Sequence, residues 1–299
     1  MDNLLLLFSA PGIAAQSLID GILVGAILAL AAYGMAMVWG VMNIINIVQG
    51  EFVILGGYVT FYLAGLGLHP LFGIPAAAVV LYGVGWLVYR LVVFRVVDQD
   101  LFISILATFG ISILLQQLMN QLFGADIQSA ESGLDTWVLL DGTITIAQIK
   151  VISLIAVLLV GAFLVLFLKS TRLGRAIRAT AQDARAARIM GVDTDRVYAT
   201  TYALNAAICG AAGALVVMTW VIHPFLGILY TVRSFIIVVI AGLGNLVGVA
   251  VAGLGLGVAE NFASFILGAE FQAAFVYLLM VVILVLRNFL LGRQRRYLK

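Results

Sequence analysis

The chain has 299 residues, of which 64% are hydrophobic and 10% charged, and its mean hydropathy is +1.18. A soluble globular domain carries roughly 25% charged and 45–50% apolar residues, so this composition excludes a soluble domain. The net charge of +2 favours no class of partner, because the charges are concentrated in a few loops. Several apolar runs reach the ~20 residues that a helix needs to cross a bilayer. The sequence therefore predicts an all-α, polytopic bundle of transmembrane helices in a single domain, with about 8–9 membrane segments that include broken or half-length helices.

The first part of the chain contains five predicted spans and one polar interruption. The spans cover residues 17–39, 52–67, 72–94, 101–123 and 150–168. Small residues at four-residue spacing in the first span (Gly21, Gly25 and Ala29) would let a neighbouring helix approach closely. The interruption at residues 41–51 predicts a broken helix, and it contains the polar residues Asn43, Asn46, Gln49 and Glu51.

Residues 124–148, between the fourth and fifth spans, are polar and acidic, with almost no Lys or Arg. Ile144 and Ile146 alternate with threonines, which is typical of a short strand. Because basic residues gather in cytoplasmic loops, this acidic segment is expected on the extracytoplasmic side.

Residues 169–196 form the only long polar run between two strongly apolar segments, and they hold seven of the sixteen Lys and Arg. Small and apolar residues recur there at helical spacing and form a stripe: Leu173, Ala176, Ile177, Thr180, Ala184 and Ala187. This pattern predicts a short amphipathic helix that ends near Gly191, with Thr194 or Asp195 capping the next helix. A cytoplasmic loop is basic in any membrane protein. That rule explains the arginines but not the stripe, which favours a helix that docks on a partner.

The rest of the chain contains spans at about 197–221, 249–267 and 271–291, and a half-length segment at 231–242. The half-length segment ends in a glycine-rich break with Gly242, Gly244 and Asn245. The basic tail at residues 293–296 is expected in the cytoplasm, beside the loop at 169–196. Counting five spans back from that loop places the N-terminus outside.

Two acids, Glu51 and Glu260, fall within the apolar region, each near an amide and glycines. An ionisable group at the bilayer centre costs ~2.5–3.5 kcal/mol, so it tends to face a cavity or a partner. One helix break in each half of a transporter is a common sign of its substrate path. The sequence predicts a path lined by Asn43, Asn46, Gln49, Glu51, Gly242, Gly244, Asn245 and Glu260. The alternative is that both acids lie at span ends, in water or capping a helix.

The sequence lacks the common motifs for catalysis and for metal binding. The chain has no Gly-Lys pair, and hence no P-loop, and it has no Gly-x-Ser-x-Gly or His-Glu-x-x-His motif. His69 and His223 have no Cys or acid close in sequence, and Cys209 is the only cysteine. We therefore expect neither an enzyme nor a metal site.

Several of these segments, in this order, resemble the permease subunits of branched-chain amino acid (LIV-type) ABC transporters. They are 21–30 (GILVGAILAL), 39–46 (WGVMNIIN), 49–52 (QGEF), 172–179 (RLGRAIRA), 191–194 (GVDT) and 241–245 (AGLGN). The resemblance implies a bacterial or archaeal inner-membrane importer. Its partners would be a second permease, related or identical, two cytoplasmic ATPases that bind the ATP, and an extracytoplasmic solute-binding protein, with no cofactor on this chain and no nucleic acid.

By the same resemblance, the helix in 169–196 would be the one that couples to an ATPase. The residues implied are Arg172, Leu173, Gly174, Arg175, Ala176, Ile177, Arg178, Ala187 and Gly191. The chain departs from the family at Gln49, where His is usual, and at Val247, where Pro is usual. Because both departures lie in the predicted path, urea or short amides stay open as alternative solutes. Two other classes stay open: an ion-gradient transporter that uses Glu51 and Glu260, and a channel-like or scaffold protein.

Overall fold

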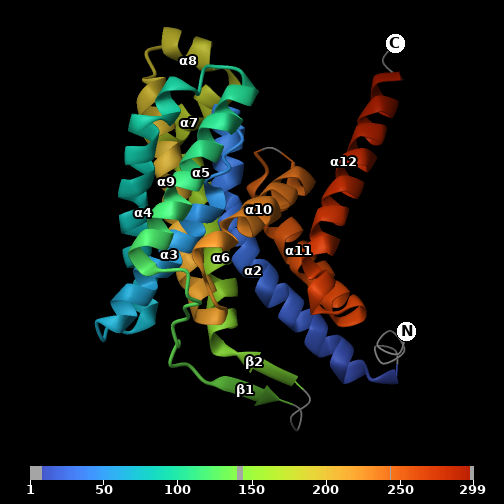
Figure 1. Ribbon diagram of the computed structural model, residues 1–299. Coiled ribbons are helices and arrows are strands. Elements are labelled where there is room, and N and C mark those ends of the chain that lie inside the picture. The colour runs from blue at the N-terminus through green and yellow to red at the C-terminus, as the bar shows by residue number, and fades with distance from the viewer. Residues whose placement is uncertain (1–8, 140–143, 243, 297–299) are drawn as a thin grey trace.

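The computed structural model describes residues 9–139, 144–242 and 244–296, with side chains described as far as residue 286. Two long helices, α2 (Pro11–Met42) and α9 (Thr194–Thr219), form the centre of the bundle (Figure 1). Within the most apolar part of each, 89% of the residues are buried. Together they provide most of the hydrophobic core.

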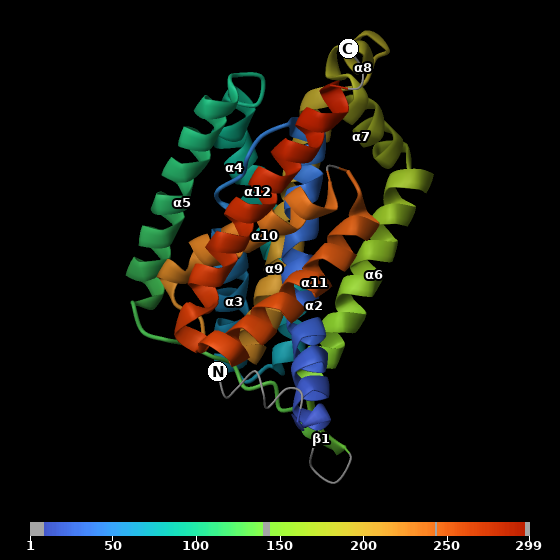
Figure 2. The ribbon, with the colours of Figure 1, turned by 90° about the vertical axis from the view of Figure 1, so that its right-hand side faces the viewer.

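The other long helices surround this centre (Figures 1 and 2). They are α3 (Gln49–Gly65), α4 (Gly73–Leu91), α5 (Leu101–Phe123), α6 (Gln148–Ser170), α10 (Gly227–Ala241), α11 (Leu246–Leu267) and α12 (Gln272–Arg296). In α4, α5, α6 and α12 less than a quarter of the most apolar part is buried, although large aliphatic side chains cover these helices. Apolar side chains left outside the core are typical of helices that face lipid.

In the part of the chain that the structure describes, eight helical segments are long and apolar enough to cross a membrane. This confirms the predicted polytopic bundle. The 17-residue α3 is not among the eight. The half-length segment begins earlier than predicted, since α10 starts at Gly227 and follows the 3-10 helix η4 (Pro224–Leu226).

Close contact between α2 and α11 explains the glycines of the first span. A Cβ atom at Gly21 would lie 2.6 Å from the Cα of Val258, and one at Gly25 would lie 2.6 Å from the carbonyl oxygen of Gly253. Real Cβ atoms do not approach backbone atoms so closely, so only glycine fits at these two positions. The predicted close helix packing is confirmed, and the neighbour is α11.

The two ends of the bundle differ. Strands β1 (Thr136–Leu139) and β2 (Ile144–Ala147) form an antiparallel hairpin at the end where α2 begins (Figure 1). The strand expected around Ile144 is therefore confirmed, while Asp141 of the same acidic segment lies outside the described residues. Helices α7 (Arg172–Gln182) and α8 (Ala184–Ile189) lie at the opposite end, where α12 also ends.

Candidate docking helices and translocation path

The predicted basic helix is two helices, not one. Asp183 lies between α7 and α8, and its side chain accepts hydrogen bonds from the backbone N–H groups of Arg185 (2.9 Å) and Ala186 (3.0 Å). An Asp that caps a second helix in this way ends the first, because its own backbone is extended. Asp193 caps α9 through the N–H of Arg196, so the cap expected at Thr194 or Asp195 was placed wrongly.

The small-residue stripe of α7 and α8 faces the chain's own bundle. Ile177, Thr180 and Ala187 are buried, and Leu173, Ala176 and Ala184 are half-buried. At Gly174 an added Cβ would lie 2.6 Å from the Cα of Leu168 at the end of α6. The stripe therefore attaches the helix pair to the bundle, which corrects the expectation that the stripe itself is presented to a partner.

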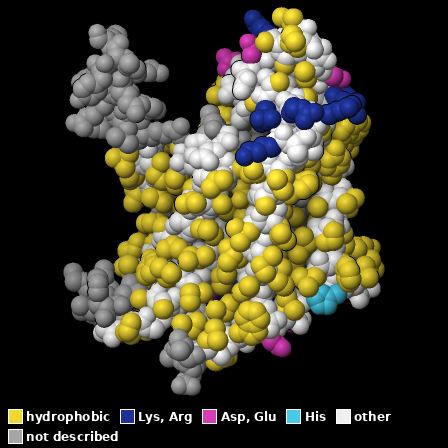
Figure 3. Space-filling model, turned by 180° about the vertical axis from the view of Figure 1, so that it is seen from behind, with side chains coloured by type: hydrophobic (Ala, Val, Ile, Leu, Met, Phe, Trp, Pro, Cys, Tyr) yellow, Lys and Arg dark blue, Asp and Glu magenta, His cyan; other side chains and the backbone are white. Residues whose placement is uncertain are grey.

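The face of α7 and α8 that remains open is basic. Arg172, Arg175 and Arg178 are exposed on α7, as are Arg185 and Arg188 on α8. Figure 3 shows the Lys and Arg side chains gathered at this end, above a largely apolar body. Gly191, with φ +85°, is also exposed, just beyond α8.

Two apolar side chains project at the tip of this end. Ile189 is 85% exposed and Met190 is 82% exposed. Neither residue was predicted from the sequence, although an apolar pair at the end of a basic helix and directly before Gly191 was a usable signal. Adjacent large apolar side chains that are this exposed mark a site of contact with another protein or with a membrane.

Two ion pairs link α8 and α9 to the neighbouring loop and helix. The guanidinium of Arg188 lies 2.9 Å from the carboxylate of Asp98, which follows α4. The guanidinium of Arg90 in α4 lies 2.7 Å from the carboxylate of Asp195 in α9. The hydrogen bond and the charge of Asp98 raise the pKa of Arg188. Arg188 also donates to the hydroxyl of Thr194 at 2.6 Å. A displacement of α8 would therefore reach α4 and α9.

The first break, residues 43–48 between α2 and α3, lies inside the bundle together with the start of α3. Asn46, Gln49 and Glu51 are each at most 1% exposed. The hydroxyl of Tyr202 donates to Asn46 Oδ1 (3.0 Å), that of Ser112 donates to Glu51 Oε1 (3.1 Å), and the Gln49 amide donates to a carbonyl of α2 (2.7 Å). These side chains join α2, α3, α5 and α9. Glu51 lies at a helix end, in the first turn of α3, as the alternative interpretation supposed, but it is buried and not in water.

The second break, residues 242–245 between α10 and α11, is more open. Gly242 and Gly244 have positive φ angles (83° and 77°), and Asn245 caps α11 by accepting from the N–H of Gly248 (2.9 Å). Gly244 and Asn245 are exposed, as is Asn43 of the first break, while Leu243 lies outside the described residues. A Cβ added to Gly40, near the end of α2, would lie 3.7 Å from the N of Gly244. The second break therefore lies beside the last turn of α2.

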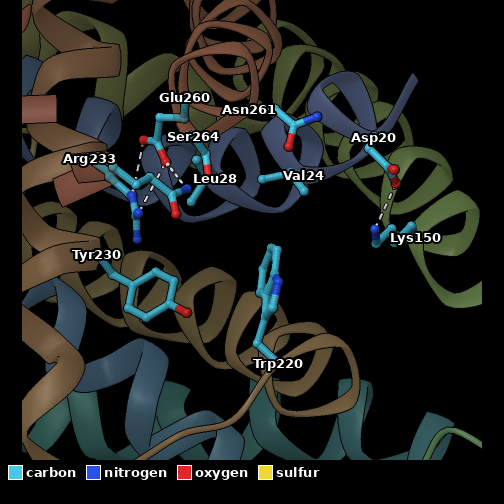
Figure 4. Close-up of a pocket in the computed structure, with 11 residues that line it drawn as sticks. Asp20, Val24, Leu28, Lys150, Trp220, Tyr230, Arg233, Glu260, Asn261 and Ser264 are labelled. Carbon is cyan, nitrogen blue, oxygen red and sulfur yellow. Dashed lines mark hydrogen bonds and ion pairs between the residues drawn. The ribbon is translucent and has the colours of Figure 1, made fainter. Parts of the chain in front are cut away.

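Glu260 lies in different surroundings from Glu51. Its carboxylate is 1% exposed and receives two 3.0 Å contacts from the guanidinium of Arg233, with Gln272 donating at 3.2 Å. The Arg233–Glu260 pair lies at a cavity of about 370 Å³, where a second pair, Asp20–Lys150, is closed at 2.8 Å (Figure 4). Arg233, Asp20 and Lys150 were not among the site residues predicted from the sequence. The eight predicted path residues are therefore divided among the first break, the second break and this cavity.

The comparisons with known proteins agree with this architecture. The sequence profile of the family described as "Branched-chain amino acid transport system / permease component" matches residues 17–284. The chain belongs to this family. It is 31% identical to the high-affinity branched-chain amino acid transport system permease protein LivH of Escherichia coli K12, over 93% of this chain and 95% of that protein. The chain is therefore a multi-pass membrane permease that works with other components of a transport system.

Relatives occur in other bacteria and in an archaeon. The permease protein BraD of Pseudomonas aeruginosa is 30% identical, with 93% of this chain and 95% of BraD covered. A probable branched-chain amino acid transport permease LivH of Methanocaldococcus jannaschii is 27% identical over 84% of this chain and 81% of that protein. No solved structure matches the chain. Among the described residues, no group of three or more His, Cys, Asp and Glu side chains could hold a metal ion.

Proposed function

We propose that this permease forms half of the membrane path of an ATP-driven importer for branched-chain amino acids. Its bacterial relatives carry that solute in their names and match 93% of this chain, and the archaeal relative carries it and matches 84%. In this proposal a second permease, related or identical, completes the path. Two cytoplasmic ATPases bind and hydrolyse ATP, so the chain itself needs no cofactor, and an extracytoplasmic binding protein delivers the solute.

The charge distribution supports an orientation with α7 and α8 in the cytoplasm. Basic residues concentrate on these helices, and the segment that contains the β1–β2 hairpin is acidic. Loops rich in Lys and Arg stay on the cytoplasmic side of a membrane. The N-terminus and the hairpin would then face the extracytoplasmic side, where the binding protein docks, and α12 would end in the cytoplasm.

The observation that carries the proposal is the surface formed by the arginine face of α7 and α8 with Ile189 and Met190. It combines exposed apolar anchors with a rim of guanidinium groups, a composition typical of protein interfaces. When the ATPases close on ATP, this surface would receive the movement. The Arg188–Asp98 and Arg90–Asp195 pairs would pass it to α4 and α9, and the bundle would then alternate access to the path.

The test replaces Ile189 and Met190 together by Asp in an affinity-tagged permease. Both side chains are more than four-fifths exposed, so the change leaves the bundle intact. We expect the ATPase subunits to be lost from the purified complex. We also expect ATP-dependent leucine uptake to stop in vesicles that hold ATP inside and have the binding protein added outside. The matched control replaces Leu66 and Leu68, exposed at the hairpin end, by Asp and should retain the ATPases. Full retention in the Ile189/Met190 variant would refute the docking surface.

Bulky replacements within the buried stripe of α7, for example at Gly174, would test the docking surface less well. Since Gly174 packs against α6, a larger residue there would disturb the permease itself. The same vesicles separate the other candidate functions. Uptake driven by an ion gradient without ATP would favour a secondary transporter, and uptake of urea or acetamide in preference to leucine would favour an amide permease.

A further inference from the structure

The cavity in Figure 4 lies at the end of the bundle that carries the hairpin. Residues of five helices and of the segment after α9 line it. They are Asp20, Val24 and Leu28 of α2, Lys150 of α6, Trp220 after α9, Tyr230 and Arg233 of α10, Glu260, Asn261 and Ser264 of α11, and Gln272 of α12. Its volume of about 370 Å³ falls in the range of roughly 300–1,000 Å³ that small-molecule sites occupy.

The charged groups of this cavity sum to zero. Two cations, Arg233 and Lys150, are paired with two anions, Glu260 and Asp20, and all four side chains are at least three-quarters buried. A ligand with a single net charge would leave an uncompensated charge in a region of low dielectric, which is costly. A ligand that carries one positive and one negative group adds no net charge, so the cavity favours a zwitterion.

Polar groups left over from these pairs are available to such a ligand. Among the described residues, Lys150 has one hydrogen-bonded partner, Asp20, for its three N–H donors. Nη1 of Arg233 has no partner in the described structure, since Nε and Nη2 contact Glu260. Asn261 donates to the backbone of Ser17 at 2.6 Å, which leaves its carbonyl oxygen as an acceptor. Cationic donors for a carboxylate and acceptors for an ammonium are therefore both present.

Aromatic side chains line the cavity beside the two ion pairs. The side chain of Trp220 points into the cavity between Arg233 and Lys150 in Figure 4. The Tyr230 ring lies 5.9 Å from the Arg233 guanidinium carbon, and Val24 adds an aliphatic surface. These groups provide an apolar contact of the kind that a branched aliphatic side chain would bury.

We propose that this cavity is a solute site of the permease, which binds a zwitterionic amino acid with an apolar side chain. The proposal rests on the transport function above and assigns that function a location. The donors of Arg233 and Lys150 bind the carboxylate, the oxygens of Asp20 and Asn261 bind the ammonium, and Trp220 contacts the side chain. Glu260 acts as a positioning residue that fixes the Arg233 fork.

A thiol-protection experiment on the purified full-length permease tests the site without any partner. Ser264 lines the cavity, and the native Cys209 is fully buried, so Ser264→Cys supplies one reactive thiol. L-leucine should slow the reaction of this thiol with a small methanethiosulfonate by about tenfold at ten times its half-protecting concentration. Leucinamide, which has only the cation, and 4-methylpentanoate, which has only the anion, should protect far less.

The controls distinguish a built site from general shielding. Ser129→Cys, exposed at the same end of the molecule, should react at the same rate with and without leucine. Arg233→Lys, which keeps the charge but loses the two-pronged contact, should raise the half-protecting concentration in the Ser264→Cys chain. Trp220→Ala should remove the preference for leucine over glycine.

Equal protection by the three ligands, or none by leucine, would overturn the site. The result is independent of the docking test. If the ATPases bind and leucine is taken up but Ser264→Cys is not protected, the importer stands and this site is wrong. If protection occurs but no ATPase binds, the site stands and the energy source has been assigned wrongly.

Discussion

The cavity end and the α7–α8 end of the molecule hold the same kind of contact in opposite surroundings. Within the described residues each end has two ion pairs, all with N–O distances of 2.7–3.0 Å: Arg233–Glu260 and Asp20–Lys150 at the cavity, and Arg188–Asp98 and Arg90–Asp195 beside α8 and α9. In the Arg233–Glu260 pair the side chains are 16% and 1% exposed, whereas in Arg188–Asp98 they are 46% and 61% exposed. The ion pairs at the two ends therefore differ in how deeply they are buried, and not in their N–O distances.

Burial changes what a pair does. A buried charge that loses its partner costs several kcal/mol, because neither water nor another ion replaces the lost contact. An exposed pair is worth about 0–1 kcal/mol, because water solvates both groups when they part. The cavity pairs therefore fix one arrangement of α2, α6, α10 and α11. The pairs at α8 can open and close at little cost, as a surface that moves against an ATPase requires.

The largest effect is expected from Arg233→Gln. It leaves the buried Glu260 carboxylate without its cation and should lower the free energy of unfolding by about 3–5 kcal/mol. The buried Cys209 reports unfolding, since a thiol-reactive dye reaches it only when the bundle opens. The midpoint of that reaction on heating is the measurement. Arg90→Gln, in an exposed pair, is the matched control and should shift the midpoint little.

A double variant completes this test. Adding Glu260→Gln to Arg233→Gln removes the unpaired carboxylate, and most of the lost stability should return. If the single and double variants unfold at the same temperature, Glu260 is not held by Arg233 in the way the contacts indicate, and the contrast between the two ends fails.

The spans were predictable from sequence because a bilayer acts on local composition. The fourth predicted span, 101–123, coincides with α5, and the two helix breaks fall where polar residues or glycines interrupt apolar runs. The partner of a helix face is not a local property. The stripe that includes Ile177 and Thr180 indicates that α7 packs against something, but only the fold shows that this neighbour is the chain's own bundle.

The ion pairs of the cavity likewise depend on contacts between helices that the sequence does not reveal. Asp20 and Arg233 fall inside the predicted spans 17–39 and 231–242, so their charges were a signal that the sequence analysis did not use. Their pairing could not be deduced, since Glu260 lies 27 residues from Arg233 and Lys150 lies 130 residues from Asp20. Glu51 and Glu260, the two acids that the sequence places within the apolar region, are both buried, yet the fold places them in separate surroundings.

An intermediate effect is expected from Asp20→Asn. Lys150 then loses its anion, but its side chain is 23% exposed and can still reach water. The hydrogen bond from Gln16 to Asp20 (2.6 Å) also becomes weaker. The loss should be about 1–3 kcal/mol, measured through Cys209 as before. Asp135→Asn, an exposed acid near the hairpin, is the control and should unfold with the parent. If Asp20→Asn and Arg233→Gln lower the free energy of unfolding equally, the exposure of an ion pair does not determine how much stability its loss costs.

The smallest effect on stability is expected from Asp98→Asn, which opens the exposed pair with Arg188. Its cost should be at most about 1 kcal/mol, because both groups are hydrated when apart. It should also vanish in high salt, since the screening length falls from ~10 Å at 0.1 M to ~3 Å at 1 M. If the pair transmits movement from α8, the variant should still retain the ATPases and yet hydrolyse more ATP for each leucine imported. A variant that is as stable as the parent and equally efficient in transport would show that Arg188–Asp98 is an incidental surface contact, and that the coupling between α8 and the bundle runs through the buried stripe instead.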